Sequence, residues 1–172
     1  DDFIGGIRMV GGEDVPGGLT EADGVEIAQA LARTGTIDFI NIVKGSIATD
    51  EAISHVIPGI GTPMGPALQF AGRFRERVDL PIFHAARIAD VATARYAISE
   101  GLLDMVGMMR AHMADPHIVR KLEAGQEDRI RPCVGASYCI NRLYLGLEAL
   151  CIHNPATGRE ETIPHLVTRS SG

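Results

Sequence analysis

Short β-like runs alternate with helical patterns over the first 125 residues, and this alternation limits the possible folds more than any other feature. The strand candidates are rich in apolar and β-branched residues, and they cover residues 3–10, 38–43, 80–84 and 104–109. Strands that alternate with helices pair in parallel through right-handed crossovers. The sequence therefore predicts an α/β fold.

Capping signals mark the helices between these strands. Thr20 is placed as an N-cap, and Asp23 three residues later suits a capping box. Asp115 followed by Pro116 reads as an N-cap with proline in the first helical position. Helices are expected over residues 20–35, 65–77, 90–100 and 116–124.

Four βα units are too few for a closed barrel, because a complete (β/α)₈ barrel needs about 250 residues. The runs are apolar enough for strands that are covered on both faces. We therefore expect the C-terminal half of a TIM barrel over residues 1–130, and a complete small doubly wound domain is the alternative. A cysteine-bearing segment is expected at 131–160, and a linker at 161–172.

Composition narrows the function. The 172 residues include 22 acidic and 16 basic side chains, a formal charge of -6, so the basic surface that nucleic acid requires is missing. No apolar run approaches the roughly 20 residues of a membrane helix. Three cysteines do not suggest a disulfide framework, so a reducing, cytoplasmic compartment is expected. Open parallel strand edges favour a homo-oligomer.

Two arginines follow predicted strands, Arg87 after residues 80–84 and Arg110 after residues 104–109. Loops at this end of a barrel commonly bind phosphate, and guanidinium groups suit a dianion such as the phosphate of FMN. The alternative is two surface arginines. Arg8 lies within an apolar strand, where it faces either an electron-rich ligand or a partner in a buried ion pair.

The Gly/Pro-rich stretch over residues 44–63 is long for a plain connection, and such loops are often functional. Asp50 and His55 within it are candidates for substrate contact or proton transfer. Solvated loop charges are the alternative for both. His84 ends an apolar strand and is expected to be a core histidine.

The cysteines have the spacing Cys133-x5-Cys139-x11-Cys151. Thiolates spaced in this way suit an iron–sulfur cluster. A zinc site completed by His153 and three reduced thiols are the alternatives.

Five segments, in order, carry a family resemblance: GGIRMVGGEDVPGGLT, DFINIVKGS, FHAARIAD, DMVGMMRAHMADP and RPCVGASYCINRLYLGLEALCIHNPATGRE. The first four are similar to the fifth to eighth strands, and the last to the cluster loop, of the iron–sulfur flavoenzymes of the old yellow enzyme class. This class includes trimethylamine, dimethylamine and histamine dehydrogenases, 2,4-dienoyl-CoA reductase and N-methylproline demethylases.

The resemblance implies an FMN site. Arg8 would contact the pyrimidine side of the flavin, and Arg87 with the backbone of Ala86 would hold the phosphate. Met109 and Arg110 would complete the phosphate site. The family has glycine where this chain has Ala86 and Met109, and a backbone N–H contact survives this change if φ is negative there.

The resemblance also implies that Cys133, Cys139 and Cys151 are three of four cluster ligands. The fourth position falls on Ala136, which cannot bind iron. A three-cysteine cluster, a cluster with a non-protein ligand and no cluster all stay open.

The implied activity is FMN-dependent oxidation of a C–N bond in a small N-methylated amine, with electrons leaving through the cluster to an acceptor that the sequence does not identify. One alternative is an NAD(P)H-dependent ene or 2,4-dienoyl-CoA-type reductase. The other is a non-catalytic phosphate- or zinc-binding half-barrel. Because the first four strands of the family's barrel are absent, this segment alone is expected to be inactive.

Overall fold

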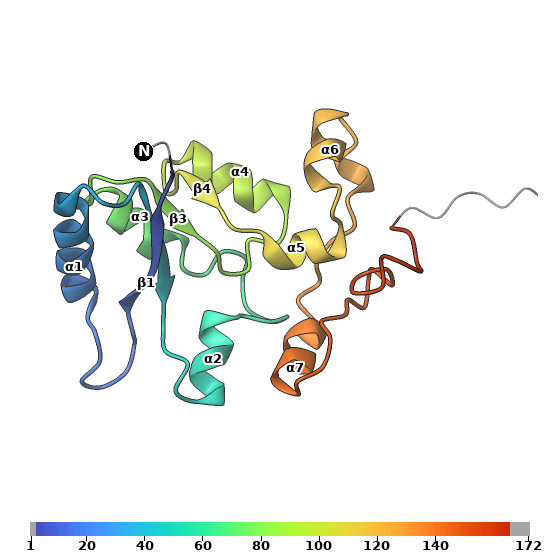
Figure 1. Cartoon of the computed structure of the whole chain (residues 1–172), viewed down its shortest axis with the longest axis horizontal. Helices are drawn as coiled ribbons and strands as arrows, with labels where there is room; N and C mark the ends of the chain where they lie inside the picture. Colours follow the sequence, from blue (N-terminus) through green and yellow to red (C-terminus); the bar gives the residue numbers. More distant parts are fainter. Residues whose placement is uncertain (1–2, 166–172) are drawn as a thin grey trace, which may run out of the picture. The chain divides into compact units, whose positions relative to one another are not determined.

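The computed structural model describes residues 3–165 and has an α/β architecture (Figure 1). All strand pairs are parallel, and the sheet order follows the sequence. The strands are β1 (Gly6–Gly12), β2 (Phe39–Lys44), β3 (Ile82–His84) and β4 (Met105–Val106). A doubly wound sheet needs a point where the strand order reverses. The sequential order therefore excludes the doubly wound alternative.

The chain divides into two compact units, Asp1–Met108 and Met109–Gly172. The first holds the sheet with α1 (Glu21–Thr34), α2 (Asp50–Val56), α3 (Leu68–Arg75) and α4 (Val91–Ser99). The second holds α5 (Met109–Ala114), α6 (Ile118–Glu123), a 3₁₀ turn (Glu127–Arg129) and α7 (Tyr138–Tyr144). Residues 109–130 thus group with the cysteine-bearing segment. The linker expected at 161–172 lies, from residue 166 onward, outside the described residues.

The capping box that the sequence predicts at Thr20 is confirmed. The Thr20 hydroxyl accepts from the backbone N–H of Asp23, whose carboxylate accepts from the Thr20 N–H at 2.9 Å. Gly35 ends α1 in the left-handed region, with φ of 63°. Asp90 caps α4 by accepting from the Thr93 N–H at 2.7 Å.

Other boundaries differ from the sequence prediction. Helix α2 interrupts the expected loop, because Thr49 accepts from the Ala52 N–H at 3.2 Å and starts a turn. Helices α5 and α7 were also not expected. Strand β4 ends at Val106, so Met109 and Arg110 lie on α5 and not at a strand end.

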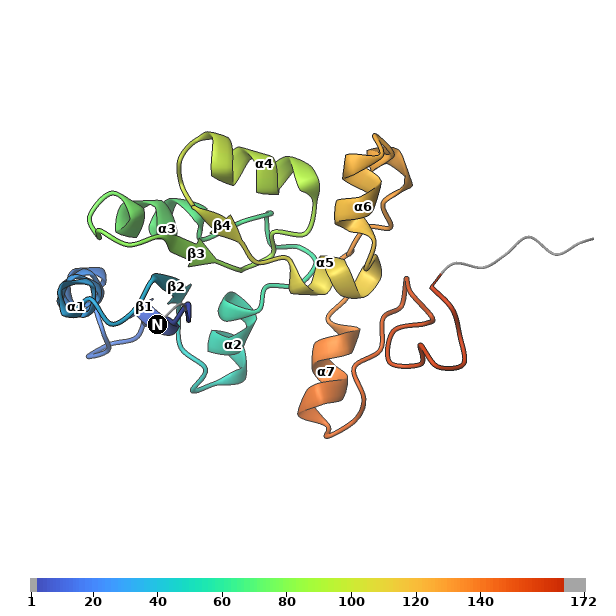
Figure 2. The same cartoon turned by 45° about the horizontal axis from the view of Figure 1, so that its top comes forward.

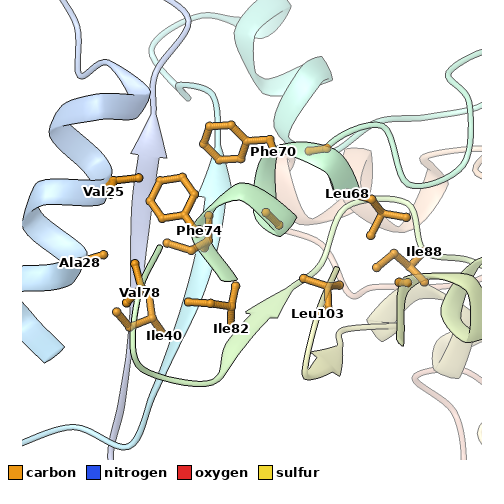
Figure 3. Close-up of a cluster of buried hydrophobic side chains, with 14 residues drawn as sticks. Val25, Ala28, Ile40, Leu68, Phe70, Phe74, Val78, Ile82, Ile88 and Leu103 are labelled. Carbon is orange, nitrogen blue, oxygen red and sulfur yellow. The ribbon is translucent and has the colours of Figure 1, made fainter. Parts of the chain in front are cut away.

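Apolar residues on one face of the sheet form the core of the first unit (Figure 3). Ile40 and Ile82 are adjacent across β2 and β3, and both are fully buried. Phe74 of α3 is also fully buried and belongs to the same cluster. Helix α1 packs on β1, α3 on β2 and β3, and α4 on β4 (Figure 2). Among residues 3–165 no helix is long and apolar enough to cross a membrane.

Gly24 allows α1 to approach β1. A Cβ atom at this position would lie 2.1 Å from the backbone carbonyl oxygen of Gly11. We expect Gly24→Ala to lower the free energy of unfolding by about 1–3 kcal/mol through overpacking. Helix propensity alone predicts that the free energy of unfolding rises by about 1 kcal/mol. A melting temperature that falls in Gly24→Ala therefore supports overpacking, and one that rises supports the effect of propensity. The control is Ala30→Gly at an exposed position of α1, which measures the effect of helix propensity at a site where no steric clash is involved.

Candidate functional site

Arg87 occupies the loop directly after β3 and has an unusual conformation. Its φ is 50°, in the left-handed region that residues with a Cβ rarely adopt. Its Nε donates to the Thr62 carbonyl at 2.7 Å, and its own carbonyl accepts from the Gly65 N–H at 3.1 Å. Nη1 is buried and has no hydrogen-bond partner among the described residues. The guanidinium is thus fixed on one side and keeps a spare donor, which suits a phosphate group.

Two neighbouring strands each present an unsatisfied buried acceptor. Oδ1 of Asn41 on β2 has no partner within the described part of the chain, and the same is true of Nε2 of His84 on β3. The other ring nitrogen of His84 lies 2.7 Å from the Ile42 carbonyl, so Nδ1 carries the proton and Nε2 is the bare acceptor. Burial lowers the pKa of His84, the hydrogen bond to the Ile42 carbonyl opposes this effect, and the charge of Arg8 lowers the pKa further.

Three buried polar atoms have no partner among the described residues: Asn41 Oδ1, His84 Nε2 and Arg87 Nη1. The register pairs Asn41 with Phe83 and Ile42 with His84, so the side chains of Asn41 and His84 lie on opposite faces of the sheet. Because buried polar groups in native proteins are almost always hydrogen-bonded, we expect each of the three to have a partner beyond the described residues. The sequence analysis singled out Arg87 and missed Asn41. His84 is a core residue, as predicted, but its Nε2 has no partner among the described residues. A polar residue within the apolar run FINIV was the available signal for Asn41.

Arg8 lies on β1 in register with Asn41 and is exposed. The alternative of a buried ion pair is therefore wrong. The side chain stays available to a ligand on this face of the sheet, where Phe39 and Phe83 stack with ring centroids 4.5 Å apart. The donors and acceptors of the first unit thus fit a flavin phosphate at Arg87 and an electron-rich group at Arg8.

Ala86 and Met109, where the family has glycine, keep a backbone conformation in which the N–H can contact a ligand. Among residues 3–165, the non-glycine residues with positive φ are Asp14, Arg87 and Ser137. Ala86 and Met109 therefore lie outside the left-handed region, and the condition for a backbone N–H contact holds at both. Met109 and Arg110 belong to the second unit, so their part in a phosphate site stays a prediction.

Asp50 and His55 lie on α2, at its first and last turns, and not in an irregular loop. Both are exposed, and α2 has no buried residue. Their position matches the alternative of solvated charges better than a role in proton transfer.

All three cysteines are free thiols, and all three line one cavity of the second unit together with Arg110, Met113 and His153. Burial raises the pKa of the Cys139 thiol, and the charge of Arg110 opposes this effect. Ala136 is exposed and offers no donor atom. In the described part of the chain, no three His, Cys, Asp or Glu side chains stand close enough to hold a metal ion. The three cysteines thus line one cavity, but within the described residues they do not form a metal site.

Asp115 stabilises the segment before Cys133 through hydrogen bonds to residues between 117 and 131. Its carboxylate is buried, and it accepts from the N–H groups of His117 at 3.0 Å and Arg131 at 2.8 Å. It also pairs with Lys121, whose Nζ donates to the Arg129 carbonyl at 2.7 Å. The prediction of Asp115 as a plain N-cap is wrong, because α6 begins later and the carboxylate serves residues far along the chain.

The motif HNPATGRE anchors the segment after the last cysteine. The Asn154 amide and the Thr157 hydroxyl both donate to the Met113 carbonyl, at 2.9 and 2.7 Å. The Asn154 side-chain oxygen accepts from the Ala156 N–H at 3.2 Å. These bonds satisfy a carbonyl near the end of α5 that the helix leaves free. The motif therefore has a structural role within the second unit.

The pH dependence of this unit follows from Asp115. Burial alone raises the pKa of Asp115, but hydrogen bonds from Arg131, Lys121 and His117 outweigh it, so the pKa lies below its ordinary value. The stability that Asp115 contributes is present above the unfolded-state pKa of about 4 and is lost as pH falls through the lower folded value. A circular-dichroism titration from pH 6 to 2 should show this loss, and Asp115→Asn should abolish that part of it. An unchanged acid transition in the variant contradicts the assignment.

No protein-family model matches the chain. A probable N-methylproline demethylase of Rhizobium meliloti (strain 1021) is 53% identical over 99% of this chain and 25% of the relative. The multifunctional alkene reductase/demethylase OYE of Caballeronia cordobensis is 48% identical over 99% of this chain and 24% of the relative. The chain is homologous to flavoenzymes of the old yellow enzyme class. It spans about a quarter of the length of the curated relatives it matches.

A further curated relative and a solved structure are also similar to this chain. The N,N-dimethylglycine/sarcosine dehydrogenase of Chromohalobacter salexigens is 43% identical over all of this chain and 25% of its own length. A solved structure of 2-naphthoyl-CoA reductase with 2-naphthoyl-CoA matches with a TM-score of 0.84 and 23% identity, covering 96% of this chain and 25% of that one. At this identity the structural match shows the fold alone: four parallel strands that align with a quarter of an old yellow enzyme-class TIM-barrel enzyme.

Proposed function

We propose that the chain is the C-terminal half of an FMN-binding TIM barrel with its cysteine-bearing segment, and that the whole protein oxidises a small N-methylated amine. One observation carries this proposal. The relatives at 53% and 43% identity are named for N-methylproline and for N,N-dimethylglycine and sarcosine, which are all N-methylated amino acids. The substrate class that these names share is an N-methylated amino acid.

Bound FMN would supply the redox chemistry by accepting a hydride, that is two electrons and a proton, from a C–H bond of a carbon attached to the amine nitrogen. The residues of this chain would bind and polarise it. Arg87 would hold the phosphate through its unsatisfied Nη1, supported by the backbone N–H of Ala86. Arg8, exposed on β1, would stabilise negative charge on the pyrimidine side of the flavin.

The cysteine cavity would hold the centre through which electrons leave. Cys133, Cys139 and Cys151 are donors of the type that iron–sulfur clusters use, and they line a single cavity. Within residues 3–165 these thiols are not assembled into a metal site.

The second candidate is reduction of an activated alkene. The relative at 48% identity is named both an alkene reductase and a demethylase. The same FMN contacts would serve either reaction, so the residues of this chain do not separate them.

The test uses the full-length protein that contains this chain, purified without oxygen. FMN, iron and sulfide are measured, and the protein is incubated with sarcosine or N-methylproline while formaldehyde release is followed. Bound FMN with formaldehyde release supports the proposal. Reduction of cyclohexenone by NADH without demethylation supports the reductase instead, and a protein without flavin leaves the non-catalytic half-barrel. Residues 1–172 alone are expected to release no formaldehyde.

A further inference from the structure

Residues 46–57, which include α2, are attached to the first unit at their two ends. On one side the Gly45 N–H donates to the Gly12 carbonyl at 2.7 Å, and Gly45 is buried. Its φ of 100° lies in the region that favours glycine, so the chain can turn sharply at this point. On the other side Pro58 is fully buried. The segment between these two attachments belongs to the long Gly/Pro-rich stretch of the sequence.

No hydrogen bond or ion pair joins residues 46–57 to another segment of the described chain. Their bonds are local: the Ala52 N–H donates to the Thr49 hydroxyl, and the Ser54 hydroxyl donates to the Glu51 carbonyl. Helix α2 has no buried residue, and a helix of seven residues is marginal on its own. Segments with few buried contacts open at a low free energy. Residues 46–57 can therefore move about their two ends.

This segment has one charged side and one apolar side. Asp50 and His55 are exposed on one side of α2, whereas Ile53 and Val56 on the opposite side are half-buried. Ile47, just before the helix, is 70% exposed. The apolar side chains are thus covered only in part, and a bound ligand could complete their burial.

The segment lies at the end of the sheet where a ligand is expected. It begins where β2 ends, and Figure 1 shows α2 beyond the carboxyl end of this strand. The chain that follows it is held by Arg87, because the Thr62 carbonyl accepts from Arg87 Nε at 2.7 Å. Barrels of parallel strands build their active sites from the loops at this end. Since Arg87 is the candidate for the FMN phosphate, the segment adjoins the proposed flavin site.

We propose that residues 46–57 form a lid that pivots about Gly45 and Pro58 and closes over the ligand at the carboxyl ends of β2 and β3, burying Ile47 against it. The identity of this ligand, an N-methylated amino acid beside the flavin, rests on the proposed function. Closure of such a lid excludes water from the reacting groups and holds the substrate in place. The apolar side chain of Ile47 suits the methyl groups of this substrate class.

The experiment measures hydrogen–deuterium exchange in the full-length protein with bound FMN, without oxygen and without a reductant. One ligand is methylthioacetate, in which sulfur replaces the amine nitrogen of sarcosine, and the other is cyclohexenone. Changes in the flavin absorbance report the binding of each ligand independently of exchange. The variants are Ile47→Ser and the control Ile98→Ser, because Ile98 is 45% exposed on α4 and lies outside the segment.

Peptides from residues 46–57 are expected to exchange about fivefold more slowly once a ligand saturates the protein, because closure depopulates the open form. Ile47→Ser should lose most of this protection and bind the ligand about tenfold more weakly, because serine lacks the apolar contact. Ile98→Ser should match the wild type. Unchanged exchange in the wild type, when the flavin absorbance shows binding, overturns the lid. Exchange that is slow before any ligand is added also overturns it, because another part of the protein then covers the segment.

The lid and the proposed function fail in different ways. Protection by methylthioacetate supports both, and protection by cyclohexenone alone supports the lid and favours the reductase over the demethylase. Formaldehyde release from sarcosine or N-methylproline without protection of residues 46–57 overturns the lid alone. A full-length protein without FMN overturns both.

Discussion

Replacing Asp115 with alanine is expected to destabilise the second unit by about 3–5 kcal/mol, the usual cost of leaving a buried charge without its partner. The Asp115 side chain is 2% exposed and that of Lys121 is 17% exposed. Removal of the carboxylate strands the Lys121 ammonium and leaves the backbone N–H groups of Arg131 and His117 without acceptors. Each of these losses acts on the segment that enters Cys133.

Hydrogen–deuterium exchange in the full-length protein measures this effect locally. Peptides from residues 109–153 should exchange far faster in Asp115→Ala, because the opening free energy of this unit falls. Asp128→Ala removes an exposed carboxylate from the neighbouring 3₁₀ turn and should change nothing. Equal exchange in the two variants would refute the role given to Asp115. The double variant Asp115→Ala/Lys121→Met should recover part of the loss, because it removes the stranded charge.

The sequence predicts those features of the fold that depend on residues close together in the chain. It does not predict those that depend on residues far apart in the chain. The caps at Thr20 and Asp90 were predictable because each depends on a hydrogen bond three residues away. Asp115 has the same local pattern, but its carboxylate accepts from Arg131, sixteen residues on. No spacing within the helix reveals that use.

The same limit applies to the candidate site. A position after a strand was enough to single out Arg87, but its spare Nη1 depends on the Thr62 carbonyl of a preceding loop. The unsatisfied Asn41 depends on burial that only the assembled sheet creates. Cysteine spacing predicted a shared cavity, yet the orientation of His153 by Pro132 required the folded segment.

Replacing Arg87 with alanine is expected to weaken FMN binding by about a hundredfold, because charge-assisted hydrogen bonds to a phosphate contribute about 3 kcal/mol. The buried Nη1 without a partner is the donor that the phosphate would occupy. Arg87→Lys should fall between wild type and alanine. A single ammonium group cannot both replace the bond to Thr62 and present a planar pair of donors.

Titration of the flavin-free, full-length protein with FMN and with riboflavin separates phosphate binding from folding. Riboflavin has no phosphate, so Arg87→Ala should weaken FMN binding and leave riboflavin binding nearly unchanged. Arg33→Ala, at an exposed position in the last turn of α1, should preserve the wild-type preference for FMN. If Arg87 only braces the loop at Thr62, both flavins lose affinity equally, and the phosphate site must then be sought among other residues.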